Sequence, residues 1–103
     1  MKYVFFDLES QLLFDEVGGH DHADKLKVAC VVTYSTDKND FTVYWEKDVP
    51  ALLTELKSAP KVIGFNLISF DYRVLQPYAN QVRLASIPTV DMLVDIHRNF
   101  SLS

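Results

Sequence analysis

The sequence predicts an α/β fold in which helices cover a mixed β-sheet. Three strands are predicted first, at 2–8, 26–35 and 41–46, because these segments are rich in the apolar, β-branched and aromatic residues typical of strands. Helical and extended segments then alternate along the rest of the chain. A meander of strands followed by alternating helices and strands is typical of a mixed sheet with helices packed against it.

The first three strands are the best defined part of this prediction. Segment 2–8 is almost wholly apolar, and its length suits a strand inside the sheet. Residues 9–25 contain Gly18-Gly19 and a polar stretch, so we expect most of them to form a loop or a hairpin connection. The second and third strands are separated only by the turn-forming residues 36–40, which predicts an antiparallel hairpin.

The second half of the chain is predicted to supply three helices and two short strands. Asp48 and Pro50 indicate the start of the first helix, which ends before Pro60 because proline disfavours helical geometry at the preceding residue. The other predicted elements are a strand at 61–65, a helix from residue 69 to about residue 78, an extended segment at 84–87 and a helix at about 89–99.

The composition is that of one folded domain. The chain has 103 residues, 49% of them hydrophobic, which leaves no room for a second domain. A formal net charge of −4 argues against a broad basic surface for nucleic acid, but not against an enzyme whose acids are neutralised by divalent cations. The sequence shows no membrane span or signal peptide, and its single cysteine, Cys30, is interpreted as a small buried residue rather than a reactive thiol. We therefore expect a cytoplasmic protein without a disulfide framework.

Asp7 and Glu9 stand two residues apart at the end of the first predicted strand. Residues i and i+2 of a strand point to the same face, roughly 6–7 Å apart along the chain. Two carboxylates on one face repel each other unless a cation lies between them, so the pair is a candidate metal site. The alternative is a solvent-exposed pair, because Asp-x-Glu is a common tripeptide, and the spacing alone does not decide between the two.

A second candidate lies where the strand at 61–65 runs into the following helix. Gly64 and Asn66 occupy the junction, and Asp71 is expected in the first turn of the helix. The helix dipole favours a carboxylate at that position, so Asp71 taken alone is interpreted as a capping residue.

The sequence His20-Asp21-His22 is a third candidate, because histidine and aspartate bind transition metals. No further cluster of ligands accompanies these residues in the sequence. A solvated loop is therefore the preferred interpretation.

Taken together, the first two candidates resemble the first two motifs of the DEDD-type 3′–5′ exonucleases, which belong to the ribonuclease H-like superfamily. Residues 5–9, Phe-Phe-Asp-Leu-Glu, match the family's Asp-x-Glu motif at the end of the first strand. Residues 66–71, Asn-Leu-Ile-Ser-Phe-Asp, match its Asn-x-x-x-Phe-Asp motif at a strand-to-helix junction. The chain is most similar to the ribonuclease H-like nuclease domains found alone or with helicase-like proteins, through Gly18-Gly19, residues 62–66 and residues 88–93.

The resemblance implies a five-stranded sheet in the order 3-2-1-4-5, with acids gathered at the ends of strands 1 and 4. It implies a nuclease that hydrolyses phosphodiesters with two Mg²⁺ or Mn²⁺ ions, which prefer oxygen ligands. Asp7, Glu9 and Asp71 would be the catalytic metal ligands, while Asn66 and Phe70 would shape the site and contact the substrate. The implied partners are a DNA or RNA substrate and a helicase-like partner or domain, with no membrane.

The third motif of the family is missing from the chain. This motif, Tyr-x-x-x-Asp or His-x-x-x-x-Asp on a late helix, supplies a fourth acid and a general base, and nothing after Asp71 matches it. We therefore expect residues 1–103 to be the N-terminal part of one incomplete domain, inactive alone, with its fourth acid beyond Ser103. Asp91 and Asp95 are less favoured substitutes, and Asp91 is expected to cap the last helix or to support a ligand.

Two rival interpretations stay open. A non-catalytic ribonuclease H-like module would bind nucleic acid or a protein partner without holding metal at Asp7, Glu9 and Asp71. A plain interaction domain would carry Asp7 and Glu9 as surface acids that point away from Asp71.

Overall fold

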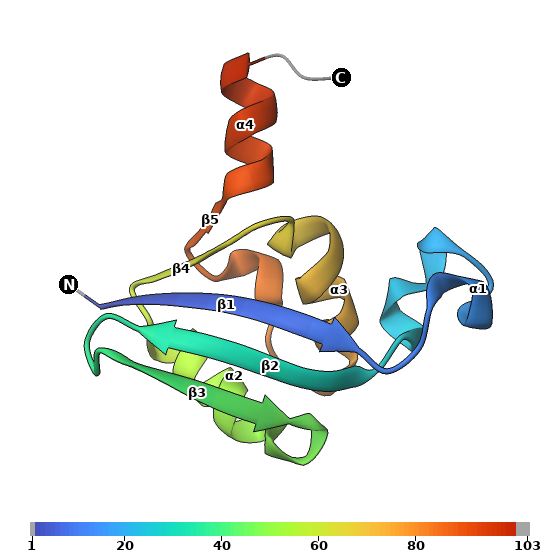
Figure 1. The fold of residues 1–103 in the computed structure, drawn as a ribbon, viewed down its shortest axis with the longest axis horizontal. Coiled ribbons are helices and arrows are strands. Elements are labelled where there is room, and N and C mark those ends of the chain that lie inside the picture. Colours follow the sequence, from blue (N-terminus) through green and yellow to red (C-terminus); the bar gives the residue numbers. More distant parts are fainter. Residues whose placement is uncertain (1, 101–103) are drawn as a thin grey trace.

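The computed structural model describes residues 2–100, and its centre is a five-stranded sheet in the order β3-β2-β1-β4-β5 (Figure 1). β1 pairs antiparallel with β2, and β2 with β3, which confirms the predicted hairpin. β1 pairs parallel with β4, and β4 with β5, so the sheet is mixed and has the predicted strand order. The strands are β1 (Tyr3–Ser10), β2 (Val28–Ser35), β3 (Asp40–Trp45), β4 (Lys61–Gly64) and β5 (Thr89–Asp91).

A short turn connects β2 to β3, whereas the other connections contain helices, and α2 and α3 lie on the same side of the sheet (Figure 1). α4 follows β5 directly and extends away from the sheet. No helix among residues 2–100 has the length and apolar character that a membrane span requires. The helices are α1 (Phe14–Val17), α2 (Val49–Ser58), α3 (Tyr72–Leu75) and α4 (Met92–Phe100), with a π-helical turn at Leu67–Asp71 and short 3₁₀ turns elsewhere.

The prediction was wrong at several points along the chain, including Cys30, which was interpreted as buried and is only partly buried. The connection at 9–25 holds α1 and a 3₁₀ helix, His20–Lys25, rather than a loop alone. The segment 84–87, predicted to be extended, begins with a 3₁₀ turn. The fifth strand lies instead at β5, in residues 89–91, which were predicted to begin the last helix. Leu84 and Ile87 are apolar because they are buried in the core, and a run this short does not reveal whether burial comes from a strand or from a turn.

The hydrophobic core lies between the sheet and α2 and α3. Val4, Phe6 and Leu8 of β1 are buried, whereas the residues between them are exposed on the opposite face. On α2, Leu52 and Leu56 are completely buried in the same core. The sheet therefore has one face covered by helices and one open face.

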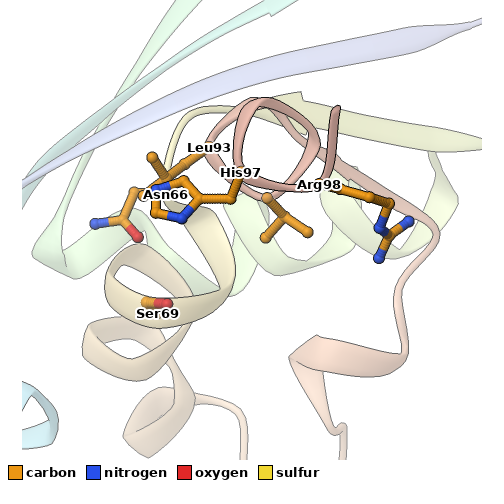
Figure 2. Close-up of a pocket in the computed structure, with 6 residues that line it drawn as sticks. Asn66, Ser69, Leu93, His97 and Arg98 are labelled. Carbon is orange, nitrogen blue, oxygen red and sulfur yellow. The ribbon is translucent and has the colours of Figure 1, made fainter. Parts of the chain in front are cut away.

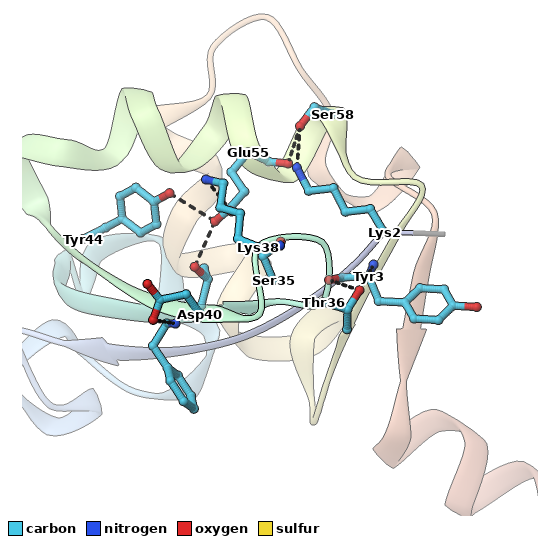
Figure 3. A network of polar contacts seen from close by, with 11 residues as sticks. Lys2, Tyr3, Ser35, Thr36, Lys38, Asp40, Tyr44, Glu55 and Ser58 are labelled. Atoms are coloured by element: carbon cyan, nitrogen blue, oxygen red, sulfur yellow. Dashed lines mark hydrogen bonds and ion pairs between the residues drawn. The ribbon is translucent and has the colours of Figure 1, made fainter.

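Glu55 joins α2 to the β2–β3 hairpin by polar contacts as well (Figure 3). Its Oε1 accepts hydrogen bonds from Thr33 Oγ1 at 2.9 Å and from the Tyr44 hydroxyl at 3.1 Å. Its Oε2 lies 3.9 Å from Lys38 Nζ. Burial, and then the nearby negative charge of Glu55, raise the pKa of Tyr44 to about 12. The neutral hydroxyl donor is therefore retained at any physiological pH, which keeps α2 fixed to the hairpin.

Candidate functional site

The candidate site forms where β1 and β4 separate. The two strands pair only from Tyr3 to Phe5 on β1, and β4 ends at Gly64. Farther along β1, the backbone N–H of Leu8 instead donates a hydrogen bond of 3.2 Å to Oδ2 of Asp71. A side chain 63 residues away in the chain thus occupies the place beside β1 that a strand would otherwise fill.

The local sequence explains how the chain reaches this position. A Cβ atom at Gly64 would lie 2.6 Å from the buried Leu67 side chain, so the close approach of these residues requires glycine. Asn66 has φ of 60°, in the left-handed region that asparagine adopts more readily than most residues. The π-helical turn Leu67–Asp71 follows, a rare structure that is frequent at functional sites. Its last residue is Asp71.

Asp91, at the end of β5, holds this turn in place. Its Oδ1 accepts hydrogen bonds from the backbone N–H of Asn66 at 2.8 Å and of Leu93 at 3.1 Å. Its Oδ2 accepts one from Ile68 N at 3.0 Å. The bond to Leu93 lies in the first turn of α4, which confirms the predicted capping role. Because backbone donors engage both of its oxygens, Asp91 is a poor substitute for the missing fourth acid.

Asp71 is buried, with 4% of its surface exposed. Its pKa is raised to about 7, first by burial and then by the negative charge of Asp7, while the N–H of Leu8 offsets part of the rise. Its side chain makes no capping hydrogen bond to α3, so the interpretation of Asp71 as a capping residue was wrong. A buried carboxylate beside a second one is typical of sites where a cation binds or a proton is exchanged.

Glu9 lies on the same exposed face of β1 as Asp7. The strand register shifts immediately after Glu9, and such bulges are common beside functional sites. Among residues 2–100, no three His, Cys, Asp or Glu side chains gather closely enough to hold a metal ion, and this includes His20-Asp21-His22. The oxygen donors suit Mg²⁺ or Mn²⁺, but of the three predicted ligands the structure brings Asp7 and Asp71 together and leaves Glu9 farther along the strand.

The two residues predicted to contact the substrate lie in different surroundings. Asn66 lines a groove of about 500 Å³ between the π-helical turn and α4 (Figure 2). Phe70 is half-buried and packs edge-on against Phe14 of α1, with ring centroids 5.8 Å apart. Phe70 therefore supports α1 beside the site.

A second groove, of about 630 Å³, contains Asp7 on the open face of the sheet. Its apolar lining includes Phe5, Phe41, Phe65 and Met92, which we did not predict as site residues. The signal was present in the sequence, because β1 and β3 carry apolar residues at positions that face away from the core. The groove places aromatic rings next to the candidate metal ligand.

The fold is similar to that of known proteins, although the sequence is not. The chain superposes on part of a family B DNA polymerase from the hyperthermophilic archaeon Pyrobaculum calidifontis with a TM-score of 0.67, over 96% of its length and at 18% sequence identity. It spans 16% of that polymerase chain. No family model and no curated protein matches the sequence. Strand order and structural similarity together define an α/β domain with a ribonuclease H-like fold.

Proposed function

We propose that this domain belongs to a metal-dependent nuclease, a 3′–5′ exonuclease that hydrolyses nucleic acid phosphodiesters, with Asp7, Glu9 and Asp71 as metal ligands. The observation that carries the proposal is the contact of Asp71 with β1 beside Asp7. The two motifs of the resemblance are distant in sequence, and they meet in space. The ribonuclease H-like fold is compatible with this activity but does not by itself establish it.

The chemistry of the acids supports the proposal. Two bound Mg²⁺ or Mn²⁺ ions would supply an activated water and stabilise the leaving oxygen of the phosphodiester. The protein's part is to hold the cations between carboxylates that repel each other when no cation is present. The pKa of Asp71 is about 7, and a cation bound beside this residue would lower that pKa and favour the carboxylate form that acts as a ligand. Glu9 would complete the ligands that β1 provides.

A fourth carboxylate completes the site in the family that the chain resembles. Since the third motif is absent from the sequence, we propose that this acid comes from outside residues 1–103 and that the chain alone hydrolyses little or no substrate. Association with a helicase-like protein stays a prediction of the resemblance.

Metal binding tests the proposal in the chain itself. Mn²⁺ affinity is measured by calorimetry at pH 8 for the wild type, Asp7→Asn and the control Asp37→Asn, which removes the same charge from an exposed position of the β2–β3 turn. We expect Asp7→Asn to weaken binding by roughly tenfold or more, and the control to leave it unchanged. In a form of the protein that includes the proposed fourth acid, Asp7→Asn should also abolish Mg²⁺-dependent release of nucleotides from a 3′-labelled strand. Equal Mn²⁺ affinity and undiminished hydrolysis in Asp7→Asn would contradict the assignment.

A second candidate function is a non-catalytic module that binds nucleic acid or protein. It is favoured by the finding that no three potential metal ligands converge among the described residues. A module of this kind would bind Mn²⁺ no better than the Asp7→Asn variant does. The same titration therefore distinguishes the two functions.

A further inference from the structure

The groove between α4 and the π-helical turn gathers hydrogen-bond donors from two segments (Figure 2). Asn66 and Ser69 come from the turn region, and His97 and Arg98 come from the last turns of α4. Figure 2 shows the His97 ring beside the Asn66 side chain, with Ser69 below them and Arg98 at the far end of the groove. The half-buried side chains of Leu93 and Val94 form the apolar part of the lining.

The charges of this groove favour an anion. None of its lining residues is acidic, although the chain as a whole has a formal net charge of −4. Asp91, at the start of α4, is buried, and both of its oxygens are engaged by backbone N–H groups. The Arg98 guanidinium has five N–H donors, and amide, hydroxyl and imidazole groups add further donors. Such a set matches the oxygen atoms of a phosphate group.

The lining of this groove is continuous along the chain with that of the groove that contains Asp7. Asn66 and Leu93 line this groove, while the residues that precede them, Phe65 and Met92, line the groove that contains Asp7. Both grooves therefore lie at the ends of β4 and β5, with neighbouring residues of the chain in their linings. In the second groove, Phe65 and Phe5 are 54% and 40% exposed, and exposed rings of this kind stack against the bases of single strands.

We propose that the groove of Asn66, Ser69, His97 and Arg98 binds a phosphate of single-stranded nucleic acid, one subsite away from Asp7. The proposal rests on the proposed function and deepens it, because it adds His97 and Arg98 to the substrate-binding residues and places part of the path of the strand. Arg98 and His97 contact the phosphate oxygens, and the strand continues across the exposed rings toward Asp7.

Binding without hydrolysis tests the subsite. The anisotropy of a fluorescent oligothymidylate is measured in EDTA for the wild type, Arg98→Gln and His97→Gln. The control is Arg83→Gln, which changes an exposed arginine outside both grooves. We expect Arg98→Gln to weaken binding roughly tenfold or more and to reduce the slope of log K against log salt by about 0.7. His97→Gln should weaken binding less, and Arg83→Gln should leave both the affinity and the slope unchanged.

The outcomes test the phosphate subsite independently of the proposed nuclease activity. Wild-type affinity and salt slope in both Arg98→Gln and His97→Gln would overturn the subsite, even if Asp7→Asn abolished hydrolysis. A wild type that binds no oligothymidylate at low salt would overturn it too. Competition by inorganic phosphate distinguishes a site for a nucleic acid strand from a site for a free anion. If inorganic phosphate displaced the oligonucleotide at an equal concentration of phosphate groups, the assignment to a nucleic acid strand would be contradicted. Because EDTA removes divalent cations, none of these results depends on metal at Asp7.

Discussion

The two faces of the sheet differ in what they do, and β1 contributes to both. Its alternate residues Val4, Phe6 and Leu8 are buried in the core, whereas Asp7 and Glu9 stand on the open face. The covered face supplies the apolar burial that stabilises the fold. The open face carries the acids of the candidate site. Because successive side chains of β1 point to opposite faces of the sheet, this one strand supplies apolar residues to the core and acids to the candidate site.

The open face is nevertheless apolar beyond its acids. Cross-strand pairs place Asp7 beside Val32 and Val32 beside Val43, so that the exposed surface continues from β1 to β3. An exposed apolar surface of this extent is typical of faces that contact another molecule or another segment of chain. Its exposed large hydrophobic residues are Phe5, Val32, Phe41, Val43 and Trp45.

The largest expected effect comes from the covered face. Leu52 is completely buried, so Leu52→Ala should lower the free energy of unfolding by about 2–5 kcal/mol through lost burial and the cavity left behind. Urea unfolding followed by circular dichroism measures this change. A cost below about 1 kcal/mol would mean that the site collapses around the smaller residue, and that this face contributes less than its burial suggests.

A smaller effect on the free energy of unfolding, which depends on pH, is expected from Asp71. The pKa of Asp71 in the folded protein, about 7, exceeds its ordinary value of 3.8, so the folded state holds a proton that the unfolded state releases between these pH values. Its contribution to stability is therefore fully present below pH 4 and is lost as the pH rises through 7. In EDTA, Asp71→Asn should raise the free energy of unfolding by about 1–4 kcal/mol at pH 8, and by little at pH 4.

Thermal unfolding at pH 4, 6 and 8 measures that difference, and Asp37→Asn is again the matched control. Added Mg²⁺ should stabilise the wild type at pH 8 but not at pH 4, because a cation competes with the proton on Asp71. A stability gap between the wild type and Asp71→Asn that did not change with pH would show that the carboxylate is not protonated in the folded protein.

The smallest effect is expected on the open face. Val43 is 49% exposed, and Val43→Thr should change the free energy of unfolding by no more than about 0.5 kcal/mol. Val31→Thr, the same substitution on the buried side of β2, should cost about 1–3 kcal/mol because the hydroxyl is buried. Equal costs in urea unfolding would contradict the distinction between the two faces.

Elements with strong local signals could be predicted from the sequence. The β2–β3 hairpin has alternating strands around a short turn, and α2 begins after Asp48 and ends before Pro60, as its proline positions require. β5 was misplaced because a strand of three residues has too little pattern of its own, and its position is set by pairing with β4. The groove at His97 was missed for a related reason, since α4 and the π-helical turn come together only in the folded chain.

The sequence by itself determined that Asp7 and Glu9 share one face of β1, because side chains two apart on a strand point the same way. Only the tertiary structure decided which acid joins them. Asp71 reaches the N–H of Leu8 because β4 ends early, Gly64 admits the Leu67 side chain, and Asp91 holds the turn between them. Burial at this place, together with the charge of Asp7, then raises the pKa of Asp71. Such a contact depends on packing between distant segments, which no local pattern encodes.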